Sequence, residues 1–273
     1  MGNDSAMPEE RYTHGHDESV LRSHRWRTID NSAAYVADRL VAGTDVLDVG
    51  CGPGTITLDI ATRVAPGRVV GVDAAEAVVD VARDAADGRG SGGVTFEVGD
   101  VYALDLPDDS FDVVHAHQVL QHLAHPASAL EEMRRVCRPD GVVAARDSIY
   151  RAMSWYPASA GLDRWLEVYC AVAEANGGEP DAGSHLLAWA RVAGFSEVDC
   201  TASAWCFADP ADRAWWAGLW AERTTSTVLG ERAVELGVAS RDELAEVAAA
   251  WRSWGGDDDG WFLVPHGEVV CRG

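Results

Sequence analysis

Residues 46–55 read VLDVGCGPGT, a short apolar segment followed directly by a glycine-rich turn. Such an apolar segment, bounded by a turn, is typical of a strand buried on both faces of a parallel sheet. Gly50, Gly52 and Gly54 let the backbone of the turn approach a ligand closely, because no Cβ stands in the way. The spacing is G-x-G-x-G, and Thr55 stands where the dinucleotide fingerprint has its last glycine. We therefore expect a strand, a ligand-binding turn and a helix, for a ligand without a pyrophosphate.

From this segment to residue 147 the chain alternates strand-like and helical segments with short connections. Such alternation predicts parallel strands with helices on both faces of the sheet. Strands are expected at 46–49, 69–72, 94–98, 111–116 and 142–145, and helices at 56–64, 77–86 and 127–137. The predicted fold class is α/β, a Rossmann-like doubly wound sheet of seven strands, mostly parallel with an antiparallel C-terminal strand.

Three regions divide the chain in this interpretation. Residues 1–41 form an N-terminal helical lid, with a polar lead and an amphipathic helix over 28–41. Residues 42–147 form the Rossmann-like core. Residues 148–273 contain ten of the eleven tryptophans and supply substrate-facing helices and the closing strands of the same sheet. Helices are expected there at 162–176, 184–193, 210–223 and 241–254, and strands at 198–207 and 261–271.

The composition argues against several classes of protein. With 22 basic and 44 acidic residues the net charge is −22, so a nucleic-acid groove would work against the overall field. No apolar run reaches the roughly 18 residues of a membrane helix, and no secretory signal begins the chain. Six scattered cysteines without a C-x-x-C pair indicate neither a zinc site nor a disulfide framework. We expect a cytoplasmic protein with a small-molecule partner, no nucleic acid and no membrane, compatible with a homodimer.

Two acidic residues follow strands that neighbour the glycine turn in the predicted sheet. Asp73 ends the second strand, where a carboxylate can accept hydrogen bonds from both hydroxyls of a ribose. Asp100 follows the third strand, where it could accept an adenine amino hydrogen while the Val101 amide meets a ring nitrogen. Alone, Asp100 would be a common turn or cap residue. Together with the glycine turn, the two acids mark the rim at which open α/β sheets bind ligands.

A resemblance to a known family rests on motifs in a fixed order: VLDVGCGPGT, VVGVD, GDVYALDLPDDSFDVV, HQVLQHL and LEEMRRVCRPDG. Over residues 30–147 the chain is similar to class I S-adenosylmethionine-dependent methyltransferases of the ubiquinone/menaquinone-biosynthesis type. The resemblance implies S-adenosylmethionine as cofactor, with the glycine turn at its methionine part, Asp73 at its ribose and Asp100 at its adenine. One departure is Pro139-Asp140-Gly141, where the family has P-G-G. The implied cofactor-binding residues are Gly50, Cys51, Gly52, Gly54, Asp73, Ala74, Asp100 and Val101.

The segment HAHQVLQHLAHP at 115–126 contains four histidines, which raises the hypothesis of a metal site. No carboxylate or cysteine stands at ligand spacing and H-E-x-x-H is absent, so no metal is predicted. In the similar family this loop lies beside the sulfonium and the substrate. His117 and Gln118 are therefore predicted cofactor neighbours and His122 a candidate catalytic base, with capping or packing as its alternative role. A base helps only where the nucleophile has to lose a proton.

The lead segment YTHGHDE at 12–18 is similar to the lead of the same family, which folds over the cofactor. Tyr12 and His16 are therefore predicted to bind the methionine carboxylate or to shield the methyl group. Disorder is the alternative, because chain termini are often poorly ordered.

The predicted function is methyl transfer by in-line displacement to a small, apolar or aromatic metabolite, through C-, O- or N-methylation. Trp155, Tyr156, Trp205 and Trp220 are the predicted substrate pocket, with core packing as their alternative role. One rival is an NAD-dependent Rossmann oxidoreductase, which would need a complete phosphate fingerprint and a Tyr/Lys pair, whereas residues 99–150 contain no lysine. The other is a non-catalytic S-adenosylmethionine-binding regulator, which would have the same binding turns.

Overall fold

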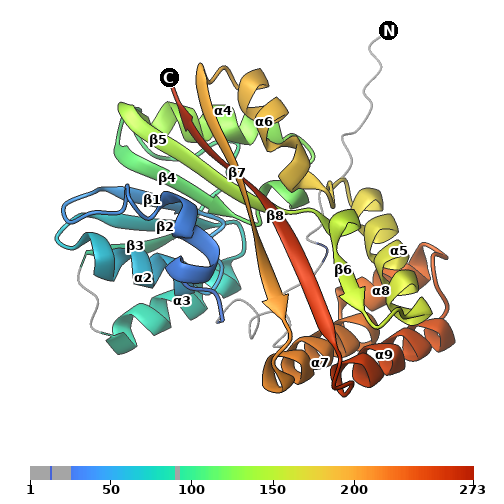
Figure 1. Ribbon diagram of the computed structural model, residues 1–273. Coiled ribbons are helices and arrows are strands. Elements are labelled where there is room, and N and C mark those ends of the chain that lie inside the picture. The colour runs from blue at the N-terminus through green and yellow to red at the C-terminus, as the bar shows by residue number, and fades with distance from the viewer. Residues whose placement is uncertain (1–12, 14–25, 90–92) are drawn as a thin grey trace, which may run out of the picture.

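The computed structural model describes residues 13, 26–89 and 93–273, and it is an α/β structure built on one eight-stranded sheet. The strands run in the order β3-β2-β1-β4-β5-β8-β6, and β7 pairs with β8 outside this path. Figure 1 shows the strands β1–β5 on one side and the long strands β7 and β8 reaching from them to a group of helices. The predicted Rossmann-like fold is confirmed, with eight strands where seven were expected.

The parallel half of the molecule comprises β1 to β5 with helices α2 to α4. β1 lies between β2 and β4, pairs with both in parallel, and is buried along its whole length. Because parallel strands end at the same rim, the turns after β1, β2, β3 and β4 come together. Its elements are β1 (Val46–Val49), α2 (Thr55–Val64), β2 (Val69–Asp73), α3 (Glu76–Arg89), β3 (Val94–Val98), β4 (Phe111–His117), α4 (Pro126–Val136) and β5 (Cys137–Ser148).

The amphipathic segment at 28–41 is not the regular α-helix that its periodicity predicted. A π-helical turn over Ile29–Ala33 is followed by a 3-10 turn over Ala34–Val36. The helix is interrupted because the backbone of Ala33 leaves the helical region, with φ −133° and ψ 17°. The apolar residues still pack in one core cluster with α2 and the sheet: Ile29, Ala33, Val36 and Leu40.

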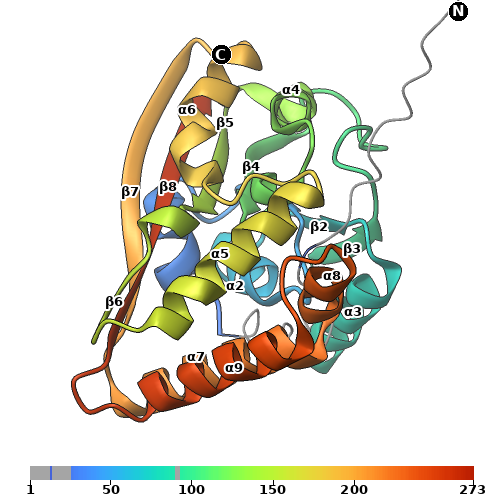
Figure 2. The ribbon, with the colours of Figure 1, turned by 90° about the vertical axis from the view of Figure 1, so that its right-hand side faces the viewer.

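The helical layer, which comprises α5, α7, α8 and α9, encloses the far ends of β7 and β8. α7 and α9 pack side by side, with α5 above them (Figure 2). The elements after β5 are β6 (Ser154–Tyr156), α5 (Ala160–Ala175), α6 (Ala182–Val192), β7 (Glu197–Phe207), α7 (Pro210–Ser226), α8 (Val228–Glu235), α9 (Arg241–Gly255) and β8 (Trp261–Arg272). Among them, α6 packs against α4, β5 and β8 and is not part of the helical layer. β6 and α8 were not expected from the sequence, and β8 runs unbroken through its proline and glycine.

Tryptophans form the centre of the helical layer. Trp165, Trp220 and Trp251 are almost completely buried. The ring centroid of Trp165 lies 4.5 Å from that of Trp220 and 4.9 Å from that of Trp251, in edge-to-face arrangements. Such pairs stabilise a core beyond the area they bury. Much of the tryptophan content therefore builds this second core.

Gly267 on β8 lies in backbone contact with Gly183 at the start of α6. Because of this close approach, the stability of the protein should be sensitive to a side chain at Gly267. A Cβ on Gly267 would lie 1.9 Å from the carbonyl oxygen of Gly183, an atom that cannot rotate away. We expect Gly267→Ala to lower the free energy of unfolding by about 1–3 kcal/mol, as overpacking does. Urea denaturation measures the change. Gly218→Ala is the matched control, because its Cβ meets nothing within 4 Å on α7; equal destabilisation of both variants would contradict the packing argument.

Candidate functional site

A cavity of about 370 Å³ lies at the rim where the parallel strands end. This volume falls within the range of roughly 300–1,000 Å³ that is usual for small-molecule sites. Its wall brings together residues that the sequence analysis selected: Gly50, Cys51, Gly52, Asp73, Ala74, Asp100, Val101, His117, Gln118 and His122. Gly54 lies in the same turn but does not line the cavity.

The glycine turn between β1 and α2 adopts a backbone that side chains would disturb. Gly50 has φ +64°, and a Cβ there would lie 2.3 Å from Cγ2 of Val119. Gly54 has φ +79° immediately before α2, and a Cβ there would lie 2.7 Å from the ring of Phe96. Positive φ favours glycine at both places. The turn is therefore held close to its neighbours while Gly50 and Gly52 present bare backbone to the cavity.

The carboxylate of Asp73 organises this turn and faces the cavity as well. Its Oδ2 accepts a hydrogen bond from the backbone N–H of Gly52 at 3.0 Å, and its Oδ1 accepts one from Ala75 at 3.0 Å. Each carboxylate oxygen has more than one acceptor site. Asp73 can thus fix the glycine turn and still accept a hydrogen bond from a ribose hydroxyl.

Asp100 occupies the equivalent position after β3. Its Oδ1 accepts a hydrogen bond from the N–H of Tyr102 at 2.9 Å, which fixes the turn, and both residues line the cavity with Val101. The arrangement leaves a carboxylate and a backbone amide next to each other, as hydrogen bonding to the edge of an adenine base requires.

The charges on the cavity wall decide which ligand it fits. Asp48, Asp73 and Asp100 contribute three carboxylates, and Arg27 is the one basic side chain besides histidine on the described wall. A pyrophosphate would meet repulsion from this set, whereas a sulfonium cation would not. Bare glycine backbone, two acids at adjacent strand ends and an excess of negative charge fit S-adenosylmethionine.

Two buried histidines on β4 have different surroundings. His115 Nδ1 lies 2.7 Å from Oδ1 of Asp48, and Asp48 also accepts a hydrogen bond from Thr57 at 2.6 Å. His117 instead stacks against His266 with a ring distance of 6.2 Å, and burial lowers its pKa well below the ordinary value. His117 is thus a neutral ring at the cavity wall. Among the described residues, no group of three or more His, Cys, Asp or Glu could hold a metal ion.

Gln118 is fixed by hydrogen bonds to three parts of the chain that lie far apart in sequence. Its backbone has φ +54°, in the left-handed region that few residues other than glycine adopt. Its Oε1 accepts a hydrogen bond from Nη2 of Arg27 at 2.5 Å, and its Nε2 donates to Oγ of Ser148 at 2.7 Å. The same Nε2 lies 3.0 Å from Nε2 of His266. The amide therefore forms a rigid part of the cavity wall.

His122, the predicted base, lies on the cavity wall in an apolar setting. Burial, assisted by the positive charge of Arg27, lowers its pKa to about 3. Its Nε2 lies 3.1 Å from Nε2 of Gln121. A ring with this pKa holds a proton poorly near neutral pH, so in this arrangement it is a weak base. Its catalytic role stays a prediction.

Asp147, buried behind Gln121, predicts a specific pH dependence of stability. Burial raises its pKa from 3.8 to about 7, although the N–H of Gln121 donates to its Oδ1 at 3.1 Å. The folded state binds this proton more tightly than the unfolded state, so protonation of Asp147 stabilises the fold. This contribution to the free energy of unfolding is fully present below about pH 3.8 and is lost as pH rises to about 7.

Asp147→Asn is therefore expected to remove a fall in unfolding free energy between pH 4 and pH 7. Urea denaturation of both proteins at pH 4.5 and pH 7.5 measures the effect as the difference between them. The comparison is needed because His117 and His266, whose pKa values burial lowers, act in the opposite direction over this pH window. Identical pH dependence of the two proteins would contradict the assignment.

The four predicted pocket aromatics separate into two pairs. Trp205 and Trp220 line a second, smaller cavity beside the first, which also has Arg27 and Gln118 in its wall. Trp155 lies on β6, stacked on Phe262 at 5.5 Å, and does not line either cavity. Tyr156, next to it, is 59% exposed and also lines neither. Trp155 therefore packs in the second core.

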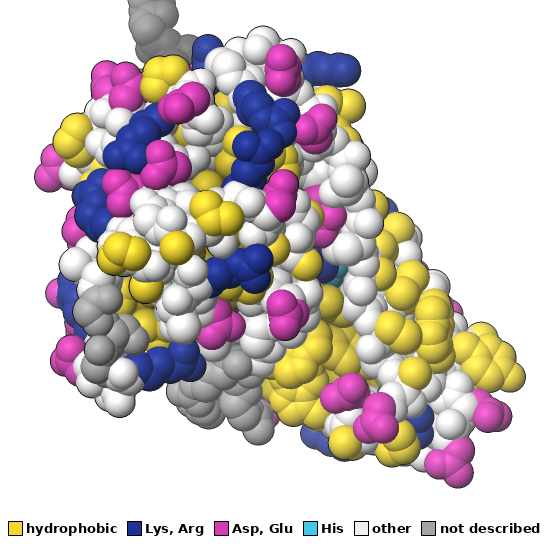
Figure 3. All heavy atoms as spheres, turned by 60° about the vertical axis from the view of Figure 1, so that its left-hand side comes forward, with side chains coloured by type: hydrophobic (Ala, Val, Ile, Leu, Met, Phe, Trp, Pro, Cys, Tyr) yellow, Lys and Arg dark blue, Asp and Glu magenta, His cyan; other side chains and the backbone are white. Residues whose placement is uncertain are grey.

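Several residues complete this description of the site. Tyr12 and His16 lie outside the described residues. Sequence reasoning did not select Arg27, which is brought to the wall by contacts distant in sequence, or Gln121, which lies between the selected residues Gln118 and His122. No helix in the described part of the chain is long and apolar enough to cross a membrane. Figure 3 shows acidic and basic side chains mixed over the parallel half, and hydrophobic side chains gathered where it meets the rest.

Comparisons with known proteins agree with this geometry. Residues 40–189 match the family model described as "Methyltransferase domain". The chain is 32% identical to an uncharacterised methyltransferase of Schizosaccharomyces pombe, over 96% of each chain. It is 30% identical to a probable methyltransferase of Aspergillus luteorubrus, over 95% of this chain and 96% of the relative.

Solved structures share the fold. The YcgJ protein of Bacillus subtilis aligns with a TM-score of 0.59 at 19% identity, over 88% of this chain and 97% of that one. The [4+2]-cyclase SpnF aligns with a TM-score of 0.53 at 25% identity, over 88% and 78%. With the family model and the full-length relatives in agreement with the cavity, the chain belongs to the class I S-adenosylmethionine-dependent methyltransferases.

Proposed function

We propose that this methyltransferase transfers a methyl group by in-line displacement to a small, apolar or aromatic metabolite. The observation that carries the proposal is the wall shared by two cavities. Arg27 and Gln118 line both the cofactor cavity and the smaller cavity that Trp205 and Trp220 help to form. An acceptor bound on the tryptophan side would approach the cofactor cavity across this wall.

The chain's own residues supply alignment and exclusion of water. When bound, S-adenosylmethionine supplies an electrophilic methyl group on a sulfonium. Asp73 and Asp100 hold the nucleoside part, and the glycine turn accommodates the methionine part. Gln118 fixes the side of the cavity nearest the tryptophans. Alignment of nucleophile and methyl group in a site without water can supply most of the catalysis, so a strong base is not required.

Calorimetry and a transfer assay test the proposal in two stages. We expect S-adenosylmethionine and S-adenosylhomocysteine to bind and NAD to leave the calorimetric signal unchanged. Binding of NAD alone would favour an oxidoreductase. The second stage follows transfer of a labelled methyl group to a panel of aromatic acids, phenols and amines. This stage is necessary because the likeness to a [4+2]-cyclase shows that the fold also serves other chemistry; cofactor binding without transfer to any acceptor would favour a regulator.

A further inference from the structure

The smaller cavity, which we call the aromatic chamber, lies between the sheet and the helical layer. Five tryptophans and a tyrosine make up much of its wall. Its lining residues are Trp26, Arg27, Gln118, Ser148, Tyr150, Met153, Trp205, Trp215, Trp216, Trp220, Arg223 and Val264. The chamber shares Arg27 and Gln118 with the cofactor cavity, so the two spaces are neighbours.

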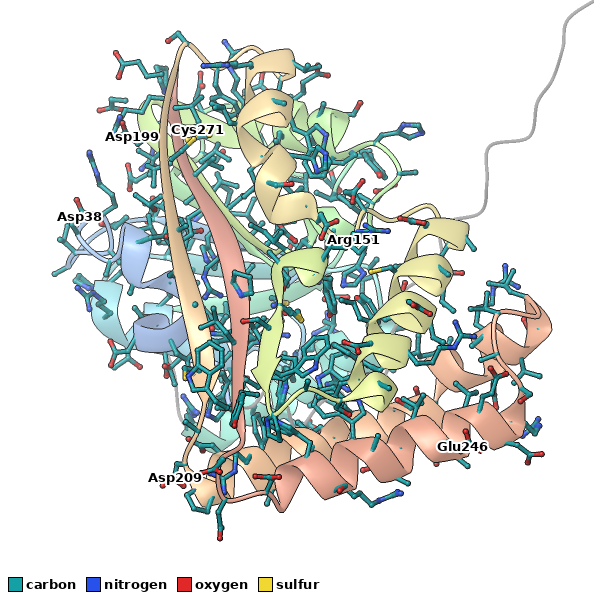
Figure 4. The ribbon with its side chains drawn as sticks, turned by 45° about the vertical axis from the view of Figure 1, so that its right-hand side comes forward. Asp38, Arg151, Asp199, Asp209, Glu246 and Cys271 are labelled. Carbon is teal, nitrogen blue, oxygen red and sulfur yellow. The ribbon has the colours of Figure 1, made fainter. Side chains whose placement is uncertain are left out.

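The charged side chains of the described chamber wall are both arginines, Arg27 and Arg223, and no acidic side chain lines it. This is notable in a chain with twice as many acidic as basic residues. Acidic side chains of the helical layer lie outside: Asp209 and Glu246, both labelled in Figure 4, are exposed. The charged side chains of the chamber wall are thus all basic, whereas these acidic side chains face the exterior.

The two guanidinium groups are held against the aromatic wall. Cζ of Arg223 lies 5.2 Å from the ring centroid of Trp220, and Arg223 is only 4% exposed. Cζ of Arg27 lies 5.8 Å from the ring centroid of Trp205. Both arginines line the chamber together with Tyr150, and both positive charges oppose the rise in the pKa of Tyr150 that burial causes. The arginines therefore act on one common space.

The size of the chamber limits what can enter it. Its volume is about 20 Å³, and a single water needs roughly 10–15 Å³ by this measure. The chamber accordingly has room for one or two water-sized groups, such as the oxygens of a carboxylate, while the body of an acceptor would lie along Gln118 toward the cofactor cavity.

Together with the aromatic wall, these features select one chemical class of acceptor. We propose that the aromatic chamber binds the carboxylate of an aromatic acid between Arg27 and Arg223, and so determines which acceptors this methyltransferase uses. The proposal rests on the proposed function. Guanidinium groups offer a planar fork of donors that matches a carboxylate, and their stacking on tryptophan fixes the fork in place. Local positive charge is needed, because the net charge of −22 would otherwise repel an anionic acceptor.

The test compares two probes of the same shape that differ in charge. 2-Naphthoate and 2-naphthamide are titrated into the wild-type protein by calorimetry, with and without saturating S-adenosylhomocysteine. We expect naphthoate to bind at least about ten-fold more tightly than naphthamide, the difference made by one charge-assisted hydrogen bond. In Arg223→Gln this preference should fall to about one, while the affinity for S-adenosylhomocysteine is retained.

Two further variants keep the result interpretable. Arg252→Gln makes the same change at an exposed position on α9 and should retain the full preference for naphthoate. Arg223→Lys keeps the charge without the planar fork and should retain part of it, even if the glutamine variant fails to fold. Equal affinities for the two probes in the wild type, including no binding of either, would overturn the proposal, as would full preference in Arg223→Gln. Failure to bind S-adenosylhomocysteine would instead refute the proposed function.

Discussion

The Asp73→Asn protein is expected to bind S-adenosylmethionine about 10- to 150-fold more weakly than the wild type, the equivalent of about 1.5–3 kcal/mol for a hydrogen bond to a charged group. Both oxygens of the Asp73 carboxylate accept backbone hydrogen bonds, from Gly52 and Ala75. Asparagine replaces one of these acceptors with an NH₂ donor, which would face a backbone N–H. The substitution thus weakens the contact with the ribose and also loosens the glycine turn.

Calorimetry with S-adenosylmethionine measures this loss directly. Asp84→Asn is the matched control, because it removes one negative charge from an exposed position on α3. Asp100→Asn should also lose affinity, since its carboxylate lies on the same wall. If the Asp73 and Asp100 variants both kept wild-type affinity while Asp84→Asn did likewise, the cofactor would not be held at this rim.

A second large effect is expected at the buried ion pair between β5 and β8. Nε of Arg146 lies 3.2 Å from Oε1 of Glu268, and Oε2 of Glu268 accepts a hydrogen bond from Thr201 at 2.7 Å. Burial lowers the pKa of Arg146 to about 10, which shows the cost of keeping its charge there. Glu268→Leu leaves that charge without its anion, and we expect the free energy of unfolding to fall by about 3–5 kcal/mol.

Urea denaturation of the wild type, Glu268→Leu, an exposed control variant and a double variant separates this effect from simple packing loss. Asp199→Asn removes an acid from an exposed pair with Arg272 on the neighbouring strands and should cost at most about 1 kcal/mol. Figure 4 labels Asp199 on β7, beside β8. The double variant Arg146→Met/Glu268→Leu removes both buried charges and should recover much of the lost stability. A double variant as unstable as the single one would show that charge is not the cause.

The parallel half could be predicted closely from the sequence, because strands buried on both faces leave a strong apolar signal. β1 to β4 begin at the expected residues, although β5 is longer than predicted. The segment at 28–41 shows the limit of periodicity: its apolar spacing is satisfied by two short turns as well as by one helix. β6 was missed because three residues, Ser154–Tyr156, carry no recognisable alternation.

The residues of the site also fall into those that could be predicted from the sequence and those that could not. Acidic residues at strand ends could be found from sequence, because topology alone brings the ends of parallel strands together. Arg27 and Gln118 are 91 residues apart and meet only through a side-chain contact. Arg223 lies in a helix whose pattern indicates ordinary packing. Trp155 and Trp220 could not be told apart beforehand, since tryptophan serves equally in a core and in a pocket wall.

β8 takes part both in the parallel half and in the part beside the helical layer, and this affects how the protein unfolds. Its later residues pair with β5, and its first residues pair with β6 beside the helical layer. A strand shared in this way makes the two cores thermodynamically interdependent, so neither should melt alone. Tryptophan fluorescence, which reports mainly on the helical layer, and loss of cofactor affinity, which reports on the parallel half, should consequently show one common midpoint of denaturation.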